Sequence, residues 1–90
     1  MKKCIVSVLG KDTVRIIAKV CTYLAEHQIN ILDISQTIIQ GYCNMMMIVD
    51  ISDLEQDFTA VCDEMATLGE EIGVTIHCQR EEIFEKMHRI

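Results

Sequence analysis

The sequence predicts an α+β fold, in which four strands form one antiparallel sheet and two helices cover one of its faces. Three observations support this prediction. Short apolar runs rich in β-branched residues alternate with longer segments of helical spacing, and the order of these segments is βαββαβ. The chain of 90 residues is also long enough for one hydrophobic core and too short for two. Residues 1–90 are therefore expected to form a single domain.

The first strand and the first helix are expected between residues 4 and 26. Residues 4–9 are a β-branched run that ends at Gly10, which is typical of a buried strand. The Asp12 carboxylate can accept hydrogen bonds from the first amides of the following helix. Apolar residues then recur at helical spacing, with polar residues on the opposite side. The predicted apolar stripe is Val14, Ile17, Cys21 and Leu24, and the polar stripe is Arg15, Lys19, Thr22 and Glu26.

A hairpin and a second helix are expected in the middle of the chain. Residues 30–40 and 45–51 are strand-like and flank Gly41, which indicates an antiparallel hairpin. Ser52 and Glu55 have the spacing of a capping box, in which the serine bonds forward and the glutamate bonds back. The apolar stripe of the helix that follows is expected to be Phe58, Val61, Met65, Leu68 and Ile72.

Gly73 is expected to end this helix, because glycine tolerates the left-handed cap conformation. Residues 74–78 alternate as a last strand, and a short C-terminal helix is expected between residues 81 and 90, with Ile83, Phe84, Met87 and Ile90 on one face. Right-handed crossovers turn the order βαββαβ into a ferredoxin-like sandwich. Because this fold carries many unrelated functions, the function has to come from its sites.

The charge balance argues against two classes of partner. Fourteen acidic residues stand against eight basic ones, for a formal net charge of −6. A protein that coats nucleic-acid phosphates needs the opposite balance, so no nucleic-acid partner is expected. No apolar run approaches the roughly 20 residues of a membrane span, so no membrane partner is expected either. The protein is expected in the cytoplasm.

The cysteines give no sign of a metal site or of catalysis. All five are widely spread, without a Cys-x-x-Cys pair or a histidine at zinc-ligand spacing, and most lie in apolar patterns where cysteine serves as a small hydrophobe. The chain also shows no nucleophile–base pair and no paired carboxylates at plausible spacing. We therefore expect no cofactor, no metal and no enzymatic activity.

Two segments carry a resemblance to a known family. Residues 8–17, Val-Leu-Gly-Lys-Asp-Thr-Val-Arg-Ile-Ile, resemble the first strand, turn and helix of ACT domains, and residues 29–37 resemble the second strand of that family. The run 33–37, the three methionines 45–47 and the tail 83–87 are similar to those of short stand-alone ACT proteins of bacteria and archaea. These proteins are in turn similar to the ACT portion of the glycine-cleavage repressor. The resemblance covers essentially the whole chain.

The resemblance implies a regulatory module that forms a homodimer, binds a small amino-acid-like ligand and regulates a partner protein, which is not identified. It implies a ligand-binding set at the first turn and at the start of the second strand: Gly10, Lys11, Asp12, Arg15, Asn30, Ile31 and Asp33. Arg15 departs from the family, which usually has a glycine at that position. The arginine either binds a carboxylate or blocks the site. If it blocks the site, the chain is a ligand-free interaction module that assembles through its sheet edges.

Each of these residues also has a purely structural interpretation. Asp12 can be a helix cap, Lys11 and Arg15 can belong to a solvated basic stripe, and Asn30 can shape a turn. Asp33 is unusual within a strand and indicates either a dimer contact or an edge that faces water. The strands also offer more apolar surface than one layer of helices covers, and the residues that form it are Ile34, Ile38, Met45, Met47 and Val49. Such a surface favours pairing of two sheets side by side.

Overall fold

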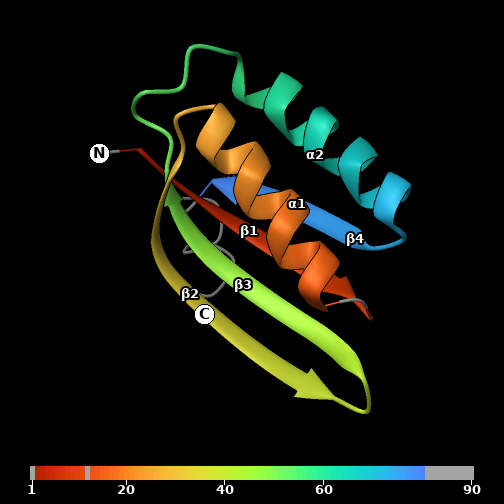
Figure 1. The fold of residues 1–90 in the computed structure, drawn as a ribbon. Helices are drawn as coiled ribbons and strands as arrows, with labels where there is room; N and C mark the ends of the chain where they lie inside the picture. Colours follow the sequence, from red (N-terminus) through yellow and green to blue (C-terminus); the bar gives the residue numbers. More distant parts are fainter. Residues whose placement is uncertain (1, 12, 81–90) are drawn as a thin grey trace, which may run out of the picture.

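The computed structural model describes residues 2–11 and 13–80 of the chain (Figure 1). The elements along the chain are β1 (Lys3–Gly10), α1 (Thr13–Glu26), β2 (Asn30–Ile39), β3 (Tyr42–Asp50), α2 (Phe58–Ile72) and β4 (Thr75–Arg80). The predicted order βαββαβ is therefore confirmed. The expected cap at Asp12 and the expected helix at 81–90 lie outside the described residues.

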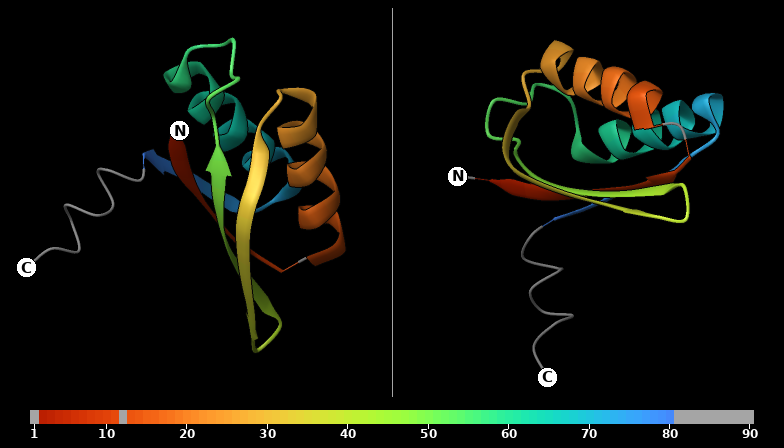
Figure 2. Two further views of the ribbon diagram at one scale, coloured as in Figure 1. Left: turned by 90° about the vertical axis from the view of Figure 1, so that its left-hand side faces the viewer. Right: turned by 60° about the horizontal axis from the view of Figure 1, so that its bottom comes forward.

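The four strands form one sheet in the order β2-β3-β1-β4, and each neighbouring pair is antiparallel. Both helices lie on the same face of this sheet, so that the described part of the molecule has two layers (Figure 2). The predicted ferredoxin-like sandwich is confirmed. The order leaves β2 and β4 as the two edge strands.

The core lies between the sheet and the helices. Every second side chain of β3 points toward the helices and is at most 1% exposed: Cys43, Met45, Met47 and Val49. Three side chains of α1 and two of α2 cover them: Ile16, Val20, Leu24, Val61 and Met65. The helical layer therefore covers Met45, Met47 and Val49, contrary to the expectation of uncovered apolar surface there. Ile34 and Ile38 do remain exposed, at 48% and 61%.

The buried face of α1 differs from the predicted stripe. Residues at spacings of four, Ile16, Val20 and Leu24, face the sheet, whereas Val14 is 79% and Ile17 is 38% exposed. The helix carries apolar side chains almost all the way round, so helical spacing fits two different stripes equally well. The close packing against β1 and β3 selects one of them and leaves the other at the surface.

The predicted capping box at residues 52–55 is wrong. Helix α2 begins six residues after Ser52, at Phe58, and its N-cap is Asp57, whose side chain makes no capping hydrogen bond. Ser52 instead donates from its backbone N–H and from Oγ to Oδ1 of Asp50, at 2.9 and 2.6 Å. Short polar side chains compete in this way with helix formation. The other end is as predicted, since Gly73 has φ 75° and ends the helix.

Candidate functional site

The first half of the predicted site lies where β1 passes into α1. Gly10 is buried on the helix-covered face, and a Cβ atom there would lie 2.7 Å from Cβ of Val74. Lys11 is exposed and its Nζ lies 4.9 Å from the ring centroid of Tyr42, the first residue of β3. Arg15 is exposed on the first turn of α1. The glycine at position 10 is thus required by packing, whether or not a ligand binds beside it.

The second half lies at the beginning of β2. Asn30, Ile31 and Asp33 are all exposed, and the pairing with β3 shifts between Ile31 and Asp33 because Leu32 is an extra residue. Ile31 is paired with Val49 and so lies on the helix-covered face, whereas Asp33 is paired with Ile48 and lies on the other face. Oδ1 of Asp33 accepts a hydrogen bond from the N–H of Ile34 at 2.9 Å.

The two halves are at opposite ends of the sheet. Gly10 is level with Cys43, which is also paired with Ile38 near the end of β2. Asn30 is level with Asp50 at the far end of β3. The seven residue steps from Cys43 to Asp50 correspond to about 23 Å at 3.3 Å per residue. A single chain therefore does not bring the predicted site residues together.

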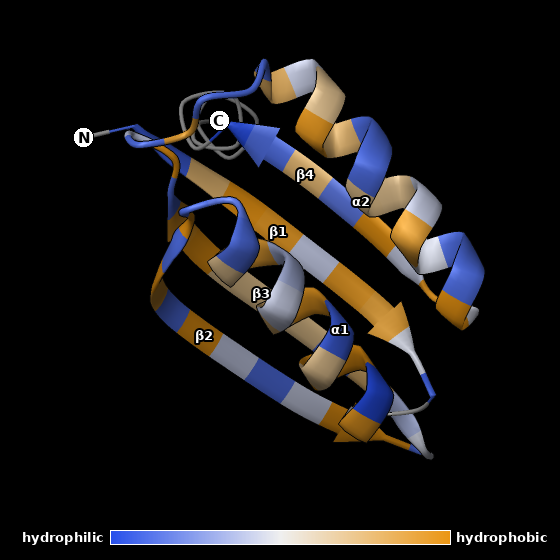
Figure 3. Ribbon diagram, turned by 45° about the horizontal axis from the view of Figure 1, so that its top comes forward, coloured by the Kyte–Doolittle hydropathy of each residue, from blue (hydrophilic) through white to orange (hydrophobic). Residues whose placement is uncertain are grey.

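Exposed apolar side chains gather along α1 and the adjacent edge strand. Figure 3 shows hydrophobic residues near both ends of β2, beside α1. All ten residues of β2 are exposed. On the helix-covered side the apolar members are Ile31, Ile34 and Ile38 of β2 together with Val14 and Ile17 of α1. We call these five residues the lateral apolar strip. The opposite edge, β4, exposes Thr75, His77 and Arg80 instead.

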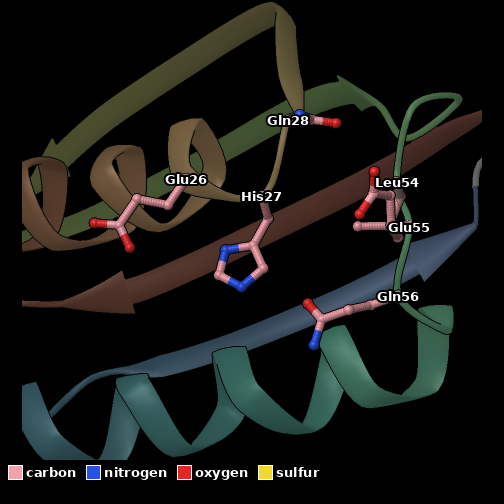
Figure 4. Close-up of a pocket in the computed structure, with 6 residues that line it drawn as sticks. All are labelled: Glu26, His27, Gln28, Leu54, Glu55 and Gln56. Carbon is pink, nitrogen blue, oxygen red and sulfur yellow. The ribbon is translucent and has the colours of Figure 1, made fainter.

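A hollow of about 140 Å³ lies at the other end of α1, away from Gly10–Arg15 (Figure 4). It is formed by the end of α1 and by the loop before α2, and the residues that line it are Glu26, His27, Gln28, Leu54, Glu55 and Gln56. The two glutamates give the lining an acidic character, which does not suit a carboxylate ligand. No sequence pattern indicates this hollow, because it depends on how the two segments pack.

A polar network beside the hollow joins α1 to α2. Oε1 of Glu64 accepts a hydrogen bond from the Tyr23 hydroxyl at 3.0 Å, and Oε2 accepts one from Nε2 of Gln56 at 2.8 Å. The imidazole of His27 stacks on the Tyr23 ring and its Nε2 lies 3.6 Å from Glu64. Burial and the contact with Glu64 raise the pKa of Tyr23 well above its usual range. The spacing of Tyr23 and His27 by four residues was the only sequence signal for this cluster.

Two further features concern residues 2–11 and 13–80. No three His, Cys, Asp or Glu side chains in these ranges are placed to hold a metal ion. Within the same ranges no helix has the length and apolar character of a membrane span.

Comparison with known proteins gives consistent results. The family model for the ACT domain matches residues 2–79. A UPF0237 protein of Bifidobacterium longum is 62% identical over the full length of both chains. A solved ACT domain protein from Streptococcus pneumoniae has a TM-score of 0.81 and 43% identity, with 93% of this chain and 94% of that chain covered. A structure assigned to the glycine cleavage system transcriptional repressors shares the fold, with a TM-score of 0.72 at 17% identity over 88% of this chain and 45% of that one.

Proposed function

The chain belongs to the ACT domain family, and on that premise we propose that it is a cytoplasmic, non-enzymatic regulatory module. In this proposal two copies form a dimer, which binds a small amino-acid-like ligand and passes its presence to a partner protein. The five cysteines, all among the described residues and all free thiols, agree with a reducing compartment.

The lateral apolar strip supports the dimer. A ten-residue edge strand offers a row of unpaired backbone groups, and such an edge invites pairing with another chain. Its apolar side chains continue onto α1, so that a second copy would bury both the edge and the strip. A two-fold axis matches each surface with itself, which is the usual arrangement in homodimers. The β4 edge offers no comparable apolar surface among its described residues.

The positions of the two half-sites carry the proposal for the ligand. If two β2 strands pair antiparallel, the second copy is reversed, and its Asn30 lies level with the Ile38 end of the first copy's β2. That end is where Gly10 passes into α1. A site split by about 23 Å in one chain is thereby assembled twice in the dimer, once at each end of the paired strands.

The chemistry of the assembled site suits an amino acid. The free amides at the start of α1 and the Arg15 guanidinium favour a carboxylate. The Asn30 amide of the partner subunit offers both a donor and an acceptor. Lys11 adds positive charge beside this turn, Asp12 completes the proposed set as a partner for an ammonium group, and Ile31 borders the site. Asp33 lies on the helix-free face, so we retain it as a contact between the two strands.

A thermal-shift experiment with each of the twenty amino acids tests the proposal. A ligand at one hundred times its dissociation constant stabilises the native state by about 2.7 kcal/mol. For a domain of this size the melting temperature should rise by roughly 10 °C or more. Asn30→Ala should weaken the response without loss of the dimer. Asn44→Ala changes another exposed asparagine, on β3, and serves as the matched control that should leave the response unchanged.

Arg15 separates this proposal from its alternative. An arginine at the start of α1 is a bulky cation where relatives of this family usually have glycine. If it binds the carboxylate, Arg15→Ala weakens the response. If Arg15→Gly instead creates or strengthens binding, the arginine is a plug. The native protein is then a ligand-free interaction module that assembles through its β2 edge.

A further inference from the structure

Three of the five cysteines meet at one place under α2. Cys4 belongs to β1, Cys78 to β4 and Cys62 to α2. In the pairing of β1 with β4, Cys4 is opposite Arg80 and Cys78 is opposite Val6. Cys4 and Cys78 are therefore diagonal neighbours on the helix-covered face of the sheet. The widely spread positions of these residues in the sequence gave no sign of this cluster.

The Cys78 thiol is the centre of the cluster. It interacts with the thiols of both Cys4 and Cys62. It also donates to the Met65 sulfur, at a distance of 3.6 Å. Cys4 is 2% exposed, whereas Cys62 and Cys78 are only half-buried. Small molecules in solvent can therefore approach the cluster from the side of Cys62 and Cys78.

The thiols differ in how readily they lose a proton. The neighbouring Cys78 thiol holds the pKa of the Cys4 thiol below its ordinary value, and the Gln79 backbone N–H and the Arg80 guanidinium act in the same direction. The contact with Cys4 and burial raise the pKa of Cys78. A thiol of lowered pKa beside a second thiol favours disulfide formation by oxidation.

We propose that Cys4 and Cys78 are a redox-responsive pair, which a peroxide oxidises to an intramolecular disulfide. The thiolate of one of the two residues attacks one oxygen of hydrogen peroxide, the O–O bond breaks, and hydroxide leaves. The sulfur of the other residue then attacks the resulting sulfenic acid, the S–S bond forms, and the sulfenic oxygen leaves as water with the proton of the thiol. In total, two thiols and one peroxide give one disulfide and two molecules of water.

The sheet explains why this disulfide would be reversible. Diagonal neighbours on adjacent strands are about 7–8 Å apart, which is slightly beyond the Cα separation of an unstrained disulfide. The bond therefore requires a small shift of β4. This strand has six residues and is an edge strand, so the shift involves its pairing with β1 and no other strand pairing of the sheet. Strained disulfides are reduced more easily, as a regulatory bond requires.

The full-length protein can be tested with dilute hydrogen peroxide, followed by blocking of the remaining thiols with N-ethylmaleimide. Intact mass under denaturing, non-reducing conditions should show three blocked thiols instead of five and one disulfide, and peptide mapping should place it between Cys4 and Cys78. Dithiothreitol should restore five free thiols. The serine variants of Cys4 and Cys78 should each lose this product.

Cys21→Ser and Cys43→Ser are the matched controls, since both remove a cysteine outside the cluster, and both should still form the disulfide. The mapping on the wild-type protein keeps the test decisive even if a buried serine prevents folding. Five thiols still available after peroxide would overturn the proposal. So would single cysteines oxidised to sulfinic acid, or a disulfide that links Cys21 or Cys43.

Discussion

At the scale of single residues, Gly10 shows how packing can account for a residue that resembles a ligand site. Its missing side chain allows β1 to approach Val74, which links α2 to β4, and Cδ1 of Ile16 lies 3.3 Å from the place of a Cβ atom. Gly10→Ala should destabilise the fold by about 1–3 kcal/mol through overpacking. Val74→Ala should recover part of this loss, because it removes the nearest methyl groups. Urea unfolding of the two single variants and the double variant measures the coupling.

Tyr23 makes a separate prediction about alkaline pH. Its pKa is raised in the folded state by burial and by Glu64, so the neutral phenol is stabilised. This contribution is fully present below the unfolded-state pKa of about 10 and is lost as the pH rises above it. The unfolding free energy of the wild type should therefore fall more steeply above pH 10 than that of Tyr23→Phe. Parallel slopes for the two proteins would contradict the assignment.

At the scale of elements, the sequence placed all four strands and both helices because strand and helix periodicities differ strongly. It could not choose the buried face of α1, because Val14 and Ile17 fit a helical stripe as well as Ile16 and Val20 do. It also placed the start of α2 too early. The pairing of Ser52 with Asp50 is a turn that uses the same residue types as a helix cap, and spacing alone does not distinguish them.

The corrected start of α2 can be tested with Glu55. In a capping box this carboxylate would accept from the backbone N–H of Ser52, and its loss would cost about 1 kcal/mol. In the structure Glu55 is exposed in the loop before the helix, so Glu55→Ala should change the unfolding free energy by less than about 0.5 kcal/mol. Ser52→Ala should be the more damaging of the two, since it loses the Oγ bond to Asp50 and the bond from Lys2, while the backbone bond to Asp50 remains.

At the scale of the whole molecule, the candidate site depends on information that no local pattern contains. The sequence identified two plausible half-sites, at 10–15 and at 30–33. Their separation follows from the strand order β2-β3-β1-β4 and from the register, which places Gly10 and Asn30 at opposite ends of β3. In our proposal the two half-sites therefore meet only in an assembly, and ligand binding should require the dimer.

Two neighbouring residues of β2 give a matched test of that assembly. Ile38 and Ile39 are almost equally exposed, at 61% and 62%, but Ile38 is paired with Cys43 on the helix-covered face and Ile39 with Tyr42 on the other. If the lateral apolar strip is the interface, Ile38→Glu buries a charge in it and should weaken the dimer at least tenfold, a cost of about 1.4 kcal/mol or more. Ile39→Glu should weaken it much less.

Sedimentation equilibrium at micromolar concentration measures both variants against the wild type, which should have twice the monomer mass of 10.3 kDa. Circular dichroism checks that each variant is folded, so that a loss of the dimer is not a loss of the fold. The Ile38→Glu variant should also lose any amino-acid response found for the wild type, because the two half-sites do not meet in a monomer. A wild type that stays monomeric, or equal losses for the two variants, would place the interface elsewhere.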